Sequence, residues 1–153
     1  MNKEQVIDAI LATLSEEFER FQNASREARS EGNDDESRAE DQYDTRSTEA
    51  NYLADGQARQ AQQAMEAMEM IQEIRNRSFG KNAKIDLGAL VKVNREGEED
   101  WFYLAPAAGG VVAKVKNKEV TVITPASPIG SQLMGLQVGE STNMPKAKVL
   151  KVC

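Results

Sequence analysis

Seven carboxylates stand within a short stretch in the first third of the chain. They are Glu31, Asp34, Asp35, Glu36, Glu40, Asp41 and Asp44, and Arg38 is the one positive charge among them. Carboxylate oxygens are the hard ligands that Mg²⁺ prefers, and one or two of them hold this ion when another molecule supplies the remaining ligands. The cluster is therefore suited to a metal ion or to a basic channel.

The residue types that are missing exclude several other chemistries. The chain of 153 residues has no histidine, which rules out Ser-His-Asp triads, Cys-His dyads and His-ligated metal sites. Its one cysteine, Cys153, can make no internal disulfide, as is typical of a reducing compartment. Exposed carboxylates recruit a Mg²⁺ ion only when another protein supplies the remaining ligands, so we expect no catalysis by the chain alone.

Apolar spacing on either side of the acids predicts two long helices. In the first, seam positions recur at steps of four and three, the period of a helix that faces one partner: Ile7, Leu11, Leu14, Phe18, Phe21, Ser25 and Ala28. A compatible period follows Gly32, at Tyr43, Ala50, Ala54, Ala61, Ala64, Met68 and Ile71. A short connection leaves the chain at the far end, so the two helices pack antiparallel.

The reversal is expected around Ala39, with the tip of the hairpin between Gly32 and Asp44. Large side chains are expected to clamp the base, namely Leu14, Phe18, Met65, Met68 and Ile71. The seam near the tip is small or polar, at Ser47, Ala50, Ala54 and Gln57. The acids then crowd the tip of a hairpin arm, although a charge run on an exposed helix can also serve solvation alone.

A second body begins where the helical period ends, between Arg77 and Lys84. Short runs rich in β-branched and aromatic residues predict strands at 90–93, 101–104, 111–115, 119–123 and 147–152. Ser127 suits a helix N-cap, Pro128 the first helical position and Gly135 the left-handed residue after the helix. The expected fold is α+β: residues 1–77 form an antiparallel coiled-coil hairpin, and 78–153 form a twisted antiparallel sheet with one short helix.

Charge is divided unevenly between these two parts. Residues 1–77 hold 9 Lys and Arg against 18 Asp and Glu, whereas 78–153 hold 10 against 7. An acidic arm is a poor partner for nucleic-acid phosphates. No run approaches 18 apolar residues and the N-terminus lacks the pattern of a signal peptide, so we expect a soluble cytoplasmic protein with no membrane partner.

At this point the chain resembles a family, the bacterial Gre transcript cleavage factors of the GreA and GreB type. The resemblance rests on the acidic hairpin followed by Ser127-Pro128-Ile129-Gly130, Leu133-Met134-Gly135 and Val138-Gly139-Glu140. It implies an FKBP-like C-terminal domain that docks on RNA polymerase, and a coiled coil that enters the secondary channel. It also implies that tip carboxylates help to hold a second Mg²⁺ at the polymerase active site, where backtracked RNA is cleaved.

Carried over residue by residue, the resemblance places the family's tip glutamate at Glu40. The family has an aspartate three residues earlier, where this chain has Ser37. The second acid of the pair is then Asp35, Asp34, Asp41 or Asp44. The candidate catalytic residues are Glu40, Asp41 and Asp44. The candidate Mg²⁺ ligands are Asp34, Asp35, Glu40 and Asp41. Docking on the polymerase is expected through Ser127, Pro128, Ile129, Gly130, Ser131 and Gln132. We expect a monomer that meets the RNA 3′ end only inside the polymerase.

Three alternatives remain at this point. A divergent member of the family would occupy the channel without cleaving, or would inhibit the polymerase. A peptidyl-prolyl isomerase would need an aromatic-lined pocket, but adjacent strand residues point to opposite faces, and Trp101 or Phe102 fits a core better. A binding module would use the hairpin as a chaperone-like or regulatory arm with no metal. The alternative to docking through 127–135 is that Pro128, Leu133 and the glycines are fold elements only.

Overall fold

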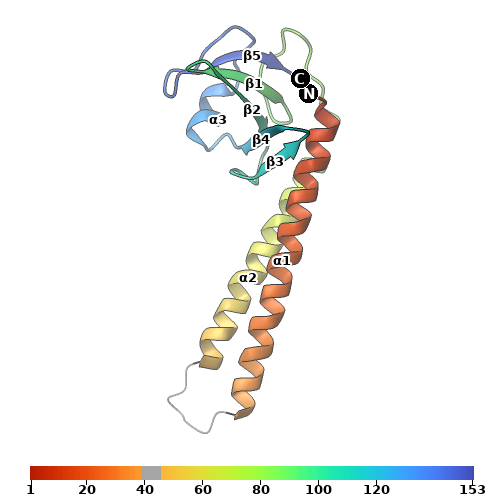
Figure 1. Cartoon of the computed structure of the whole chain (residues 1–153), viewed down its shortest axis with the longest axis vertical. Coiled ribbons are helices and arrows are strands. Elements are labelled where there is room, and N and C mark those ends of the chain that lie inside the picture. The colour runs from red at the N-terminus through yellow and green to blue at the C-terminus, as the bar shows by residue number, and fades with distance from the viewer. Residues whose placement is uncertain (39–45) are drawn as a thin grey trace. The chain divides into compact units, whose positions relative to one another are not determined.

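The computed structural model has an α+β fold. It describes the backbone of residues 1–38 and 46–153, and the side chains of 1–32 and 48–153. The helices are α1 (Lys3–Arg38), α2 (Arg46–Glu73) and α3 (Pro128–Leu133), and the strands are β1 (Leu90–Arg95), β2 (Glu98–Leu104), β3 (Val112–Val115), β4 (Lys118–Ile123) and β5 (Lys148–Val152) (Figure 1). No described helix is long and apolar enough to cross a membrane.

The chain divides into two compact units. Unit 1 comprises Met1–Leu14 and Ala67–Cys153, and unit 2 comprises Ser15–Glu66. The first turns of α1 and the last turns of α2 thus belong to the same unit as the sheet. The boundary predicted between residues 77 and 78 marks the change from helical to strand pattern, and as a domain boundary it stays a prediction.

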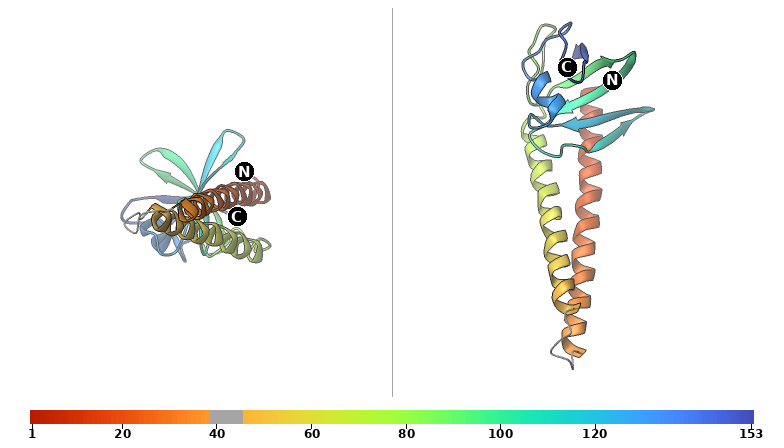
Figure 2. Two further views of the ribbon diagram at one scale, coloured as in Figure 1. Left: turned by 90° about the horizontal axis from the view of Figure 1, so that it is seen from below. Right: turned by 90° about the vertical axis from the view of Figure 1, so that its left-hand side faces the viewer.

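The sheet of unit 1 is mixed, whereas the sequence predicted an antiparallel one. Its strand order is β3-β4-β2-β1-β5, and β2 pairs with β4 in parallel while the other three pairings are antiparallel. The parallel ladder is short, running from Phe102↔Thr121 to Leu104↔Ile123. Beyond it the β1–β2 and β3–β4 hairpins diverge, as the left view of Figure 2 shows.

Each face of the sheet carries its own core because strand side chains alternate between faces. On one face, Trp101 and Tyr103 pack with Ile7 and Ile10 of α1 and Ile71 of α2. The opposite face is a second apolar cluster to which β1, β2, β4 and β5 contribute Val91, Val93, Phe102, Leu104, Ile123, Val149 and Val152 and α3 contributes Leu133. The helix ends, the sheet and α3 therefore form three layers within unit 1.

Helix α1 begins at a side-chain cap. The Asn2 side-chain oxygen accepts a hydrogen bond from the backbone N–H of Gln5 at 3.3 Å, which satisfies one of the free N–H groups at the helix start. Val6 and Ile10 are fully buried beside the predicted seam residue Ile7. The buried stripe is wider here than a two-helix seam needs, because α1 packs on the sheet as well as on α2.

Unit 2 is a helical hairpin whose seam is built largely from small residues. Ala28, Ala54, Ala61 and Ala64 are buried, as the spacing predicted, and Ser25 is 8% exposed. Met65, predicted to clamp the base, is instead 36% exposed, because Ala64 and Ala67 take the inward positions on either side of it.

Candidate functional site

In sequence, the acidic cluster covers the last turns of α1 and the residues that precede α2. Glu31 is on α1 and is exposed. Asp34 and Asp35 belong to the backbone of α1, but their side chains are outside the described residues. Glu40, Asp41 and Asp44 fall in 39–45, which is outside the described residues altogether. The catalytic and metal assignments of these five acids therefore stay predictions.

Metal binding elsewhere in the chain can be assessed more directly. Among the side chains that the structure describes, no group of three or more His, Cys, Asp or Glu residues is placed to hold a metal ion. That set does not include the acids of the predicted tip.

Two interactions fix α1 against α2 within unit 2. The buried Ser25 hydroxyl donates a hydrogen bond to the backbone oxygen of Ala54 at 2.8 Å. One turn further along α1, Arg29 forms an ion pair with Asp55 at 3.0 Å, with both side chains more than half exposed. The buried hydrogen bond sets the register, while the exposed pair adds less than about 1 kcal/mol.

The second predicted site is at the start of α3, and it is built as the capping pattern predicts. Ser127 has an extended backbone, and its Oγ accepts a hydrogen bond from Gly130 N at 3.0 Å. The same hydroxyl donates to the backbone oxygen of Thr124 at 2.8 Å. Pro128 occupies the first turn, and Gly135, with φ of 81°, follows the C-cap. Ser127 and Pro128 thus hold the helix start in place.

Gly130 has a steric reason to be glycine. A Cβ at this position would lie 2.0 Å from the backbone oxygen of Thr124 and 2.6 Å from Ser127 Oγ. Real Cβ atoms do not approach other atoms so closely, so any larger residue must displace the capping turn. Of the six residues predicted to dock, Ser127, Pro128 and Gly130 therefore have structural roles that explain their presence fully.

Gln132 also has an internal role. Its Oε1 accepts hydrogen bonds from the backbone N–H groups of Asn143 and Met144, each at 3.0 Å, and its Nε2 donates to the backbone oxygens of Met144 and Pro128. The side chain ties α3 to the loop before β5. A substitution at Gln132 disturbs this loop, so it cannot serve as a clean docking variant.

The remaining two predicted docking residues differ from each other. Ile129 is half-buried and packs against the core that contains Leu133. Ser131 is exposed, and its hydroxyl donates to the backbone oxygen of Pro128 at 3.0 Å. Ser131 and the exposed ring of Pro128 are thus the parts of this segment that face solvent.

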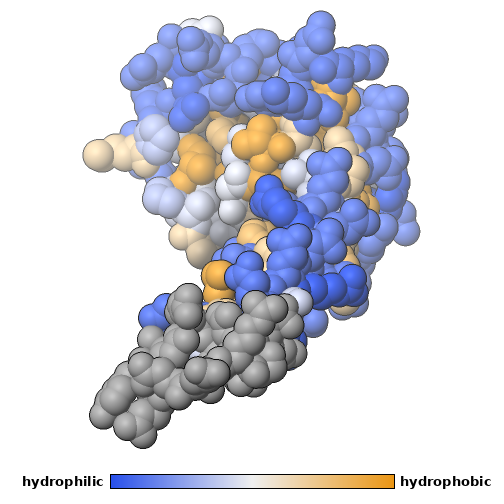
Figure 3. Space-filling model, turned by 60° about the horizontal axis from the view of Figure 1, so that its bottom comes forward, coloured by the Kyte–Doolittle hydropathy of each residue, from blue (hydrophilic) through white to orange (hydrophobic). Residues whose placement is uncertain are grey.

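Sequence reasoning missed the most exposed of the large apolar residues that the structure describes. Met144 is 81% exposed on the loop that Gln132 holds, and Tyr52 and Leu53 on α2 are 73% and 56% exposed. The signal for the last two was present, since they are large apolar residues outside the seam positions of their helix. In Figure 3 exposed hydrophobic residues form separate patches among hydrophilic ones.

Trp101 and Phe102 are core residues, as predicted. They are 7% and 8% exposed and belong to opposite faces of the sheet. The aromatic-lined pocket that a peptidyl-prolyl isomerase needs is not formed by these side chains.

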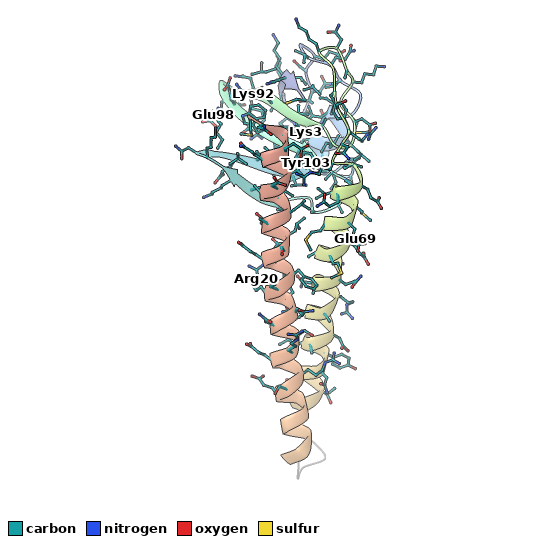
Figure 4. The ribbon with its side chains drawn as sticks, turned by 90° about the vertical axis from the view of Figure 1, so that its right-hand side faces the viewer. Lys3, Arg20, Glu69, Lys92, Glu98 and Tyr103 are labelled. Atoms are coloured by element: carbon teal, nitrogen blue, oxygen red, sulfur yellow. The ribbon has the colours of Figure 1, made fainter. Side chains whose placement is uncertain are left out.

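The helix–sheet interface of unit 1 holds an unpaired hydroxyl. Tyr103 of β2 is fully buried beside the first turns of α1 (Figure 4), and its OH has no hydrogen-bond partner among the described residues. Burial, followed by the nearby Glu4 carboxylate, raises the pKa of Tyr103 to about 12. The hydroxyl is therefore neutral, and it destabilises the folded state because it is buried without a hydrogen-bond partner among the described residues.

Charged side chains at the start of α1 and after α2 interact beside this interface within unit 1. Arg75 donates hydrogen bonds to Asp8 at 2.7 Å and to Glu4 at 2.8 Å, and these bonds raise the pKa of the guanidinium. Lys3 donates to the backbone oxygen of Arg77, and burial lowers the pKa of its ammonium. These interactions join the start of α1 to the segment after α2, which is a structural role.

Comparisons with known proteins give distant likenesses. No family model matches the chain, and no curated protein matches it. Among solved structures, the GreA factor homolog 1 (Gfh1) of Thermus thermophilus is 22% identical with a TM-score of 0.37, covering 95% of each chain. Gfh1 of Thermus aquaticus is 21% identical with a TM-score of 0.35, covering 99% of this chain and 96% of that one. A further structure, described as the transcription factor Gfh1, is 22% identical with a TM-score of 0.37, covering 95% and 92%. Likenesses at this level carry no argument about activity.

Proposed function

We propose that this chain is a bacterial transcription elongation factor that binds RNA polymerase and inserts its acidic hairpin into the secondary channel. The observation that carries the proposal is an acidic hairpin whose helices end on either side of Glu40, Asp41 and Asp44. Unit 2 as a whole has 14 Asp and Glu against 6 Arg and no Lys, a net charge of −8. Such an arm fits a basic channel in a protein and repels nucleic-acid phosphates.

The helices of unit 2 are long. Residues 15–38 of α1 span about 35 Å at about 1.5 Å per residue. The Ser25–Ala54 hydrogen bond and the small-residue seam hold the two helices together over the part of unit 2 whose side chains the structure describes. Unit 2 is therefore a slender and defined element.

Within this function we propose that Glu40, with Asp35, Asp34, Asp41 or Asp44, supplies carboxylate oxygens to a Mg²⁺ ion that the polymerase also holds. A second metal ion in phosphoryl-transfer sites activates water and stabilises the departing oxygen. The chain's own residues bring negative charge to that ion, and the polymerase cleaves its backtracked RNA. The chain is then not an enzyme by itself, and it acts in the cytoplasm as a monomer.

A second candidate has one specific observation in its favour. Ser37 stands three residues before Glu40, where an aspartate would complete the spaced acid pair of the resembling family. A tip without that pair would occupy the channel and regulate or inhibit the polymerase without stimulating cleavage.

The deciding experiment is an RNA cleavage assay on stalled elongation complexes of the cognate polymerase. The intact chain is expected to stimulate cleavage, and a Glu40→Gln/Asp41→Asn variant to lose stimulation while it still binds. Glu31→Gln is the matched control, because it removes a charge of the same cluster from the described part of α1. A chain that binds polymerase but suppresses cleavage at every Mg²⁺ concentration would establish the inhibitory candidate.

Docking through α3 needs its own test, with Ser131 as the probe. Ser131→Arg is expected to weaken polymerase binding without lowering the unfolding temperature, because the side chain faces solvent. Ser78→Arg, at another exposed serine, is the control. Unchanged affinity of the Ser131 variant would move the docking surface away from α3.

A further inference from the structure

We propose that Tyr52, Leu53 and Gly56 form a protein-docking patch on α2, called here the α2 patch, which binds a basic surface of RNA polymerase. The inference rests on the proposed function and adds a contact to it. The patch is on α2 of unit 2, and its residues belong neither to the predicted acidic cluster nor to α3.

The first support is exposure. Tyr52 and Leu53 are adjacent, large and 73% and 56% exposed, the highest values among the large hydrophobic side chains described in unit 2. Ala54 beside them is fully buried and faces α1. Since successive helical residues are about 100° apart, Tyr52 points away from the seam and Leu53 points sideways from it.

The second support is that the patch stands on a fixed part of the arm. Ala54 and Asp55 lie between Leu53 and Gly56, and α1 holds these two residues through Ser25 and Arg29. A partner that binds Tyr52 and Leu53 therefore meets a preformed surface and orders little on binding, which favours affinity.

The third support is a glycine with no role in the fold. Gly56 lies inside α2, where a glycine destabilises the helix relative to alanine. A Cβ there would meet nothing closer than the Arg59 guanidinium at 4.0 Å, so packing does not require the glycine. It follows Leu53 by three residues and Tyr52 by four, which makes it their neighbour on the helix surface. The missing side chain leaves a flat area beside two apolar ones, where another chain can approach closely.

Charge selects the partner. The net charge of −8 in unit 2 favours a surface rich in Arg and Lys. An Arg or Lys placed over the Tyr52 ring gains a cation–π contact, and tyrosine is among the residues that most often dominate binding energy. Singly exposed apolar residues are ordinary, but a paired set beside an otherwise unexplained glycine, on an acidic arm, fits an interface better.

The test measures equilibrium binding of the full-length chain to purified core RNA polymerase. Tyr52→Gln/Leu53→Gln is expected to weaken affinity about tenfold or more, because such anchors carry a large share of binding energy. Gln keeps helix propensity, so helical content by circular dichroism should persist. Met65→Gln, which changes another exposed apolar residue of α2, is the control and should leave affinity unchanged.

Gly56→Gln separates docking from folding. It is expected to raise the unfolding temperature by roughly 1–3 °C, because Gln is the better helix former, and to weaken polymerase binding. Equal or tighter binding by this variant, or unchanged affinity of the double variant, overturns the α2 patch while the proposed function stands. If the wild-type chain does not bind polymerase, both the α2 patch and the proposed function are overturned. Loss of a dimer in the double variant, seen by sedimentation with polymerase affinity unchanged, would assign the patch to self-association instead.

Discussion

Replacing Tyr103 with phenylalanine is expected to stabilise the protein. The Tyr103 hydroxyl is buried and has no hydrogen-bond partner among the described residues, and an unpaired buried donor costs about 1–3 kcal/mol. Tyr103→Phe removes this group and keeps the ring that packs with Ile7 and Ile71. We expect the free energy of unfolding to rise by roughly 1–2 kcal/mol, which raises the unfolding temperature by about 2–8 °C.

The same substitution should remove a dependence of stability on alkaline pH. The folded pKa of Tyr103 is about 12 against an ordinary value of 10.0. Between these values the folded state keeps a proton that the unfolded state has lost. Stability is therefore fully present below pH 10 and falls as the pH rises toward 12, by roughly 2–3 kcal/mol for two units. Tyr103→Phe should lack this decline.

Urea denaturation followed by circular dichroism, at pH 7 and at several values above pH 9.5, measures both effects. Tyr52→Phe is the matched control, because it removes the hydroxyl of an exposed tyrosine and should change little at neutral pH. A Tyr103→Phe protein that is less stable than wild type at pH 7 would refute the reasoning, since the hydroxyl would then have a favourable partner.

Three further predictions concern unit 1. Gly130→Ala should destabilise it by several kcal/mol in thermal melts, since the new Cβ would lie 2.0 Å from a backbone oxygen, whereas Gly80→Ala, with nothing within 4 Å, should be nearly neutral. The Leu87 N–H and then the Arg77 guanidinium lower the pKa of the Asp86 carboxyl in the folded state, so the ionised carboxylate stabilises the fold above its unfolded pKa. This stabilisation is lost as the pH falls through the folded pKa. When urea midpoints are measured at several acid pH values, Asp86→Asn should therefore show a smaller fall than wild type. A fragment of residues 78–153 should show weak amide protection and bind a hydrophobic dye, because one face of its sheet loses the cover of α1 and α2; native-like protection would contradict the shared core.

Local signals predicted the parts of the fold that neighbouring residues determine. The seam spacing located both long helices, and Ser127, Pro128 and Gly135 located α3 with its caps. Short runs rich in β-branched residues located β3 and β4, predicted as strands at 111–115 and 119–123. In each case the physical cause acts within a few residues, so a single sequence contains it.

Pairing between distant segments was not predicted. The parallel contact of β2 with β4 depends on where two hairpins meet, and no residue pattern within either strand records its neighbour. The covering of the sheet by α1 was also missed, although the wide apolar stripe of Val6, Ile7 and Ile10 was readable as a helix with more than one partner.

In the candidate sites, too, features set by neighbouring residues were predicted, and features set by distant segments were not. The capping roles at α3 followed from residue types, but the engagement of Gln132 with the loop before β5 depends on tertiary interactions that spacing does not contain. The tip acids were found by composition, and their geometry is outside the described residues. Tyr52 and Leu53 could have been predicted to be exposed, because they are large apolar residues outside the seam positions of α2.

The division of the chain makes the arm an insert in a discontinuous domain. Unit 1 is assembled from the first 14 residues and from those after 66, so the hairpin is topologically one long loop between two parts of a single core. The entropy of closing a loop grows only with the logarithm of its length, about 0.6 kcal/mol for each doubling. Whole helical turns can therefore be added to or removed from both helices with little effect on the folding of unit 1. Each residue removed from both helices shortens the arm by about 1.5 Å. The fold thus permits evolution, or an experimenter, to change the length of unit 2 without rebuilding the core of unit 1.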